Sequence, residues 1–116
     1  MEIDATPIDN ITAVAVKGRV DSATADSLTS RLVELVKAGA SRLVIDFREV
    51  SYISSAGFRT LLITARAVTQ ASGAMVLCGI SAEVQRLFDV SGFSDLFVIL
   101  PSRDDALEKL RSTGSA

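Results

Sequence analysis

Two adjacent serines, Ser54 and Ser55, lie between an apolar stretch expected to be a buried strand ending near Phe47 and an amphipathic stretch expected to be a helix beginning near Gly57. They are therefore expected at the start of that helix. The first turn of an α-helix leaves backbone N–H groups without intrahelical partners. A serine hydroxyl at this place either caps the helix by accepting a hydrogen bond from one of those N–H groups, or carries a phosphoryl group that the N–H groups and the helix dipole favour. The residues alone leave both interpretations open.

Three residues after this pair have two interpretations each. Arg59 follows Ser55 by four positions and shares its helical face, so it is either a counter-charge for a phosphoryl group or a solvated surface residue. Gly57 either lets a partner's backbone approach closely or relieves crowding at the turn. Phe58 either projects toward a partner or packs in the core, and its place on an apolar stripe with Leu61, Leu62, Ala65 and Val68 favours packing.

The residue types exclude most other chemistry. The chain has no histidine, so an imidazole base or metal ligand is absent, and its one cysteine, Cys78, cannot form an intrachain disulfide. The apolar stretch around Cys78 favours a buried thiol, and Asp46 is interpreted as a turn-forming carboxylate. We expect no catalytic residue, no metal, no cofactor and no enzyme activity.

Composition indicates one soluble domain. The 116 residues include 48% hydrophobic ones, enough for a core, and 12 Lys+Arg against 14 Asp+Glu give a net charge of −2, which does not favour nucleic-acid binding. Apolar runs are far shorter than the ~20 residues of a membrane span, and the acidic N-terminus does not resemble a secretory signal. We expect a cytoplasmic domain over residues 1–111 and a flexible tail over 112–116.

Apolar periodicity predicts an α/β fold with a mixed five-stranded sheet. Two β-prone stretches around Asp9-Asn10 predict an antiparallel hairpin, and continuous apolar runs predict buried parallel strands. Helical spacing predicts about four helices, the first from about residue 22 with Asp21 or Ser22 as its cap. The expected strands are 3–8, 11–16, 42–47, 75–78 and 97–100. Functional groups are then expected where strands 11–16, 42–47 and 75–78 hand over to helices.

Three separate segments, taken together, resemble one protein family, the anti-sigma factor antagonists, whose fold is the STAS domain. The segments are residues 44–62 (VIDFREVSYISSAGFRTLL), 18–21 (GRVD) and 80–93 (ISAEVQRLFDVSGF). They follow one another in the family's order and cover essentially the whole domain. Three dispersed matches are far more specific than any one of them.

The resemblance implies partner switching. An unphosphorylated antagonist of this family binds an anti-sigma factor that is also a GHKL-type serine kinase and so frees the sigma factor; phosphorylation ends the complex, and a PP2C-type phosphatase resets it. The matching phosphoacceptor is Ser55, with Ser54 a secondary candidate. Ser54 replaces the family's usual Asp, and Arg59 stands where glycine is frequent. Family members are usually monomers when free.

The expected docking surface surrounds the helix start. It is predicted to consist of Asp21, Ser22 and Thr24 on one side, of Ser54, Ser55, Gly57, Phe58 and Arg59 at the centre, and of Ser81 to Glu83 beyond. Asp21 either contacts the partner or only caps the first helix. The alternative function keeps the fold without the switch: a STAS-type scaffold or adaptor in a secretion-regulating or lipid-transport complex, with Ser55 unmodified.

Overall fold

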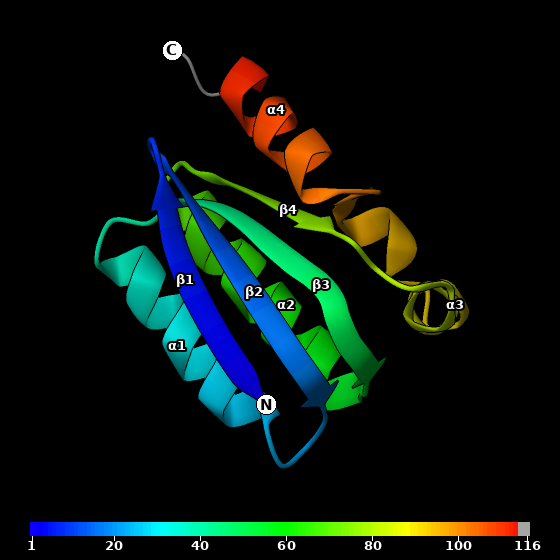
Figure 1. The fold of residues 1–116 in the computed structure, drawn as a ribbon. Helices are drawn as coiled ribbons and strands as arrows, with labels where there is room; N and C mark the ends of the chain where they lie inside the picture. Colours follow the sequence, from blue (N-terminus) through cyan, green and yellow to red (C-terminus); the bar gives the residue numbers. More distant parts are fainter. Residues whose placement is uncertain (114–116) are drawn as a thin grey trace.

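The computed structural model describes residues 1–113 and contains the mixed five-stranded sheet that the sequence predicts, in the strand order β1-β2-β3-β4-β5 (Figure 1). β1 and β2 form the antiparallel hairpin, with Asp9 of its turn in the left-handed region at φ 57°, and all later neighbours are parallel. The strands are β1 (Glu2–Ile8), β2 (Ile11–Val20), β3 (Arg42–Ile53), β4 (Ala74–Cys78) and β5 (Val98–Leu100).

Four α-helices cover the two faces of this sheet. They are α1 (Ala25–Lys37), α2 (Ser55–Gln70), α3 (Ala82–Val90) and α4 (Arg103–Thr113), with a short 3-10 helix at Ser94–Leu96 that the sequence did not predict. Helix α4 runs two residues into the predicted tail, and the rest of that tail, 114–116, lies outside the described residues. Across residues 1–113, no helix is both long and apolar enough to cross a membrane.

The core has two parts, one on each face of the sheet. The larger part joins the sheet to α1, α2 and α3, whereas the smaller part joins β3 and β4 to α4. Strand β3 contributes to both, because Leu43 and Ile45 pack in the larger cluster and Val44 in the smaller, each with no exposed surface. This confirms the prediction of a central strand covered on both faces.

Strands β2 and β3 are longer than predicted, and this length positions the functional end of the sheet. The sequence predicted strand ends at Val16 and Phe47, but the two strands continue side by side until Val20 pairs with Ile53. Register shifts between Ala15 and Lys17 and between Gly18 and Arg19 interrupt the regular pairing. Such bulges break the alternation of side chains, so residues 48–53 look like a loop in the sequence.

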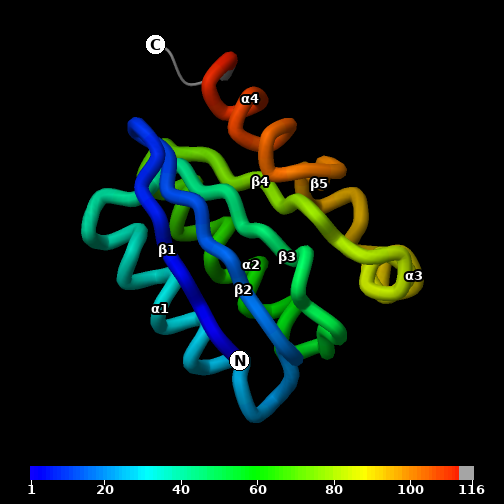
Figure 2. Tube along the Cα trace, in the orientation of Figure 1, coloured from blue at the N-terminus to red at the C-terminus, as the bar shows by residue number. Residues whose placement is uncertain are grey.

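The connections from β2 to α1 and from β3 to α2 therefore lie together at one end of the sheet, at the lower edge of Figure 2. The Ser54 N–H donates a 2.9 Å hydrogen bond to the Val20 carbonyl oxygen, which ties the start of α2 to the end of β2. Since parallel strands present their carboxyl ends to the same edge, the residues at both junctions share one surface.

Candidate functional site

The turn before α1 differs in detail from its prediction. The helix begins at Ala25 with Thr24 as N-cap, so neither Asp21 nor the exposed Ser22 occupies the capping position. Asp21 instead holds the turn: its Oδ1 accepts a 3.0 Å hydrogen bond from the Ala23 N–H, and its carbonyl oxygen accepts one of 2.8 Å from the Ala25 N–H. Hydrogen bonds from the Ala23 N–H and from Thr24 keep the pKa of Asp21 below its usual value.

Thr24, predicted to face a partner, is half-buried and bonded within this same turn. Its hydroxyl donates to the Arg19 carbonyl oxygen at 2.8 Å and accepts from the Asp21 N–H at 3.0 Å. These bonds connect the end of β2 to the start of α1. The structure therefore gives Thr24 the role of holding the turn in shape.

Ser54 and Ser55 lie at the start of α2, in different environments. Ser54 is the N-cap, yet its side chain makes no capping hydrogen bond, and its Oγ is buried without a hydrogen-bond partner. Ser55, the first residue of the helix, is exposed. The hydroxyl that the resemblance marks as the phosphoacceptor is therefore the accessible one of the pair.

Gly57 and Phe58, also predicted for the docking surface, lie in the interior. A Cβ on Gly57 would come within 2.5 Å of the Ile53 Cγ1 and 2.8 Å of the Val20 Cγ1, so glycine lets α2 approach the ends of β2 and β3. Phe58 is 2% exposed and stacks on Phe93 at a ring-centroid distance of 4.7 Å. Gly57 thus relieves crowding inside the chain, and the Phe58 side chain packs in the core.

Ser55 and Arg59 line one groove of about 490 Å³ between α1 and α2. The opposite wall comes from α1 and includes Asp26 and Thr29, which the sequence reasoning missed. The Thr29 and Thr60 hydroxyl oxygens lie 2.7 Å apart, so a hydrogen bond joins the two helices across this groove. The only signal in the sequence was the position of Asp26 and Thr29 beside the apolar stripe of their helix, which does not say what they face.

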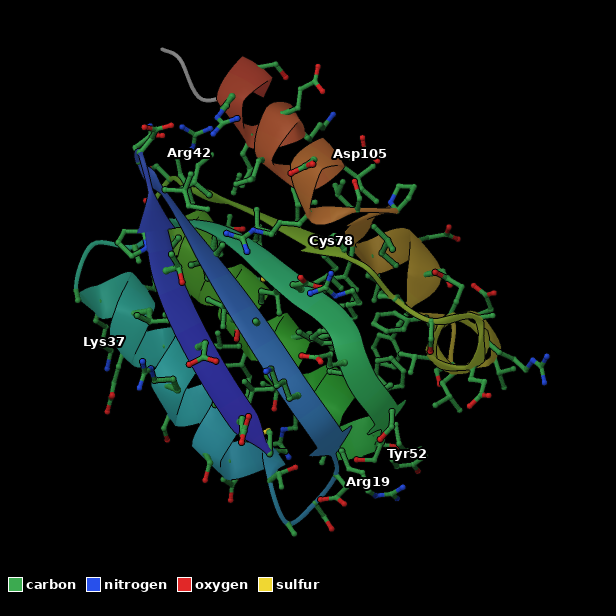
Figure 3. All side chains as sticks on the ribbon, in the orientation of Figure 1. Arg19, Lys37, Arg42, Tyr52, Cys78 and Asp105 are labelled. Carbon is green, nitrogen blue, oxygen red and sulfur yellow. The ribbon has the colours of Figure 1, made fainter. Side chains whose placement is uncertain are left out.

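Arg19 and Tyr52 form a second feature that was missed. They pair across the ends of β2 and β3, and the Arg19 guanidinium lies 4.5 Å from the centre of the Tyr52 ring (Figure 3). The Arg19 Nε also lies 3.6 Å from the Asp21 Oδ2, with 62% of the arginine side chain exposed. Arginine and tyrosine are common anchor residues at protein interfaces. Only the extended register of β2 and β3 brings them together beside Val20 and Ser54.

Ser81 and Glu83 lie at a different hollow. They line a space of about 410 Å³ with residues 48–51 of β3, and that lining shares no residue with the groove at Ser55. Ser81 is the N-cap of α3, and its Oγ accepts a 3.2 Å hydrogen bond from the Val84 N–H. The predicted docking surface therefore divides into two hollows, at the starts of α2 and α3.

The remaining candidates have structural roles. Asp46 Oδ1 accepts a 2.9 Å hydrogen bond from the Arg48 N–H, as expected of a turn-forming carboxylate. Burial raises the pKa of the Cys78 thiol to about 12, and the side chain has no exposed surface. Within residues 1–113, no group of three or more Cys, Asp or Glu side chains is arranged to hold a metal ion.

Comparison with known proteins places this arrangement in a family. The family model described as STAS domain matches residues 2–106. BtrV of Bordetella bronchiseptica, assigned as an anti-sigma factor antagonist, is 36% identical over 106 residues, which cover 91% of each chain. The anti-sigma-B factor antagonist of Bacillus subtilis is 31% identical over 99 residues, which cover 85% of this chain and 90% of that one.

A solved structure has the same architecture. The anti-sigma factor antagonist of Mycobacterium paratuberculosis superimposes with a TM-score of 0.85 at 25% identity, over 95% of this chain and 93% of that one. Likeness over nearly the full length of both chains means that the order and pairing of the elements are shared.

Proposed function

Because the chain belongs to the STAS domain family, among its anti-sigma factor antagonists, we propose that it works as a partner switch controlled by phosphorylation of Ser55. The unmodified form binds an anti-sigma factor that is also a GHKL-type serine kinase, and the sigma factor is released. The kinase transfers the γ-phosphoryl group of ATP to the Ser55 Oγ, with ADP and the hydroxyl proton as the other products. A PP2C-type phosphatase hydrolyses the ester and restores binding.

In this proposed switch the protein is not itself an enzyme. It acts in the cytoplasm as a monomer when free, and it influences transcription through its protein partners rather than by contact with nucleic acid. Its net charge of −2 supports the last point, because it offers no general attraction for phosphate backbones.

The observation that carries this proposal is the exposure of Ser55 beside the buried Oγ of Ser54. A protein kinase must reach the hydroxyl that it modifies, and only the Ser55 hydroxyl is offered to solvent at this helix start. The Ser54 side chain does not cap the helix, so the N–H groups of the first turn have no side-chain acceptor of their own. A phosphoryl group on Ser55 would meet these groups and the positive end of the α2 dipole.

Phosphorylation at this place is suited to ending a complex. An unmodified serine adds a small neutral hydroxyl to the interface, whereas a phosphoserine adds about two negative charges. Burying a charge without a partner costs several kcal/mol, and about 4 kcal/mol would already weaken binding about a thousandfold. Electrostatic cost alone is therefore sufficient for the switch.

The proposal is tested by mixing the purified protein with ATP and its cognate kinase and locating the phosphate by mass spectrometry. We expect labelling at Ser55, no labelling of Ser55→Ala, and normal labelling of Ser54→Ala. Unchanged labelling of Ser55→Ala would refute the site. Absence of labelling in the wild-type protein would favour the adaptor function, and a transporter or secretion operon around the gene would be the matching genetic observation.

A second prediction concerns binding by Ser55→Asp. The added carboxylate should lower the affinity of the variant for the anti-sigma factor kinase tenfold or more, which is on the order of 1.4 kcal/mol. Because residue 55 is exposed at a helix N-terminus, where a carboxylate is favourable, the melting temperature should not fall. Isothermal titration calorimetry and thermal unfolding measure the two effects, and a folded variant with normal affinity would contradict the electrostatic argument.

A further inference from the structure

Ser55 and Arg59 are placed to interact once Ser55 is modified. Both side chains are exposed, and both line the groove between α1 and α2. They are four residues apart on one helix, where Cβ atoms lie roughly 5–6 Å apart. The length and the planar fork of an arginine side chain allow its guanidinium to reach a phosphate on that neighbour and to donate two parallel hydrogen bonds.

The guanidinium of Arg59 is not already engaged by a carboxylate within the described part of the chain. The ion pairs found there are Lys17–Glu49, Arg19–Asp21 and Arg111–Asp9. Helix α2 contains no acidic residue. Among the described residues that line the groove, only Asp26 of α1 carries a carboxylate, and it forms no ion pair with Arg59.

The other groove residues add no charge. They are Ala25, Thr29, Ala56, Thr60 and Ile63. The nearby turn carboxylate of Asp21 is held by its own N–H partners and by Arg19. A phosphate at Ser55 would therefore find one cation in the groove, Arg59, and one opposing carboxylate, Asp26.

We propose that Arg59 is the phosphate-binding residue of this protein: the phosphoryl ester on Ser55 turns into the groove and accepts hydrogen bonds from the Arg59 guanidinium. The inference rests on the proposed function only for the statement that Ser55 is the residue modified in the cell. Phosphorylation then changes the docking surface in two ways. It adds a dianion, and it occupies an arginine that the unmodified protein leaves available to a partner.

The test installs phosphoserine at position 55 during translation, so that no kinase is needed. The ³¹P NMR signal is followed through the second ionisation of the phosphate, which lies near pH ~6 in an unperturbed phosphoserine. Because a nearby cation favours the dianion, the pKa of the phosphate should be lower in the wild-type background than in Arg59→Gln, by about half a pH unit or more. Asp26→Asn should shift that pKa in the opposite direction from Arg59→Gln, because it removes the opposing charge.

Arg66→Gln provides the matched control. It removes the same charge from an exposed position further along α2, outside the groove, and should leave the pKa of the phosphate unchanged. Arg59→Lys keeps the charge without the planar fork and should give a value between those of wild type and Arg59→Gln. Equal pKa values in wild type and Arg59→Gln, with both proteins folded by circular dichroism, would overturn the proposal.

A second readout needs no variant. The Nε–H signal of Arg59 should move when Ser55 carries phosphate, and it should follow the phosphate's titration. An Arg59 Nε–H signal whose chemical shift does not change through the titration of the phosphate would also overturn the proposal. Because the phosphoserine is installed during translation, this measurement does not depend on the kinase. Failure of kinase labelling would count against the proposed function alone, and an unchanged phosphate pKa in Arg59→Gln would count against the role of Arg59 alone.

Discussion

Ser54 and Ser55 are chemically identical neighbours, and the start of α2 separates them into a buried and an exposed hydroxyl. The distinction depends on where β3 ends and α2 begins, to within one residue. Sequence patterns locate such boundaries only to within a few residues, so they identified the pair as a helix start but gave no physical reason to prefer one hydroxyl. The preference for Ser55 came from the family resemblance.

The unpartnered Oγ of Ser54 leads to a stability prediction. Replacing an N-cap serine by alanine usually costs ~1 kcal/mol because a capping hydrogen bond is lost. The Ser54 side chain makes no such bond, so Ser54→Ala should change the free energy of unfolding by less than about 0.5 kcal/mol, or should raise it. Ser81→Ala is the control, because Ser81 does cap α3 and should cost ~1 kcal/mol in the same urea titration. Equal losses in both variants would contradict the structure.

Cys78 leads to a pH prediction. Burial holds the pKa of its thiol at about 12 in the folded protein, well above the ordinary value of 9.0. The folded state therefore keeps its thiol proton where the unfolded state loses it, so stability should fall as the pH rises above about 9 toward 12. At pH 8 the native thiol should react with a disulfide reagent only on unfolding, since on the order of one thiol in ten thousand is then ionised. Rapid labelling of the folded protein would contradict this.

At the scale of elements, the apolar stripe of α2 was interpreted correctly for most of its length and wrongly at Leu62. Phe58, Leu61 and Val68 are buried, whereas Leu62 is 39% exposed. A helix turns by 3.6 residues, so two adjacent leucines cannot both face the sheet squarely. The sequence shows that one face is apolar, but the packing partner decides where that face ends.

This difference gives a paired stability prediction. Phe58→Ala should lower the free energy of unfolding by about 3–5 kcal/mol, because it leaves a cavity against Phe88 and Phe93. Leu62→Ala, on the same helix, should cost less than about 1 kcal/mol because much of its side chain is already in water. Urea unfolding of both variants checks the comparison, and a larger loss for Leu62→Ala would place the wrong face of α2 on the sheet.

The elements that the sequence predicted well are those with simple periods. The antiparallel N-terminal hairpin and the burial of β3 on both faces were predicted correctly. The extensions of β2 and β3 were missed because bulges break the period of two. The groove wall from α1 and the Arg19–Tyr52 contact were missed for another reason: they depend on which elements lie side by side, and local patterns carry no such information.

At the scale of the whole molecule, the sheet separates the proposed site from the smaller part of the core. The proposed site lies at the start of α2, while α4 covers the opposite face with its own small core. Leu110 of α4 is 1% exposed and packs in that second core. Leu110→Ala should therefore lower the free energy of unfolding by about 2–5 kcal/mol.

The same substitution should leave labelling of Ser55 by the kinase unchanged at a temperature where the variant is folded. Thermal unfolding and the phosphorylation rate measure the two effects on one protein sample. A folded Leu110→Ala protein that is labelled several times more slowly would show that the two faces are coupled.

Only one residue, Ser54, stands between the last residue of β3 and the first residue of α2. A modified side chain in a long loop can drag its backbone to a new position, but here the attachment point is fixed on both sides by regular hydrogen bonding. Crystal structures of the unmodified and the phosphorylated protein should consequently superimpose at the junction of β3 and α2 within ordinary coordinate error. A binding partner would distinguish the two forms by direct contact with the phosphoryl group. The backbone in distant parts of the domain would be the same in both forms.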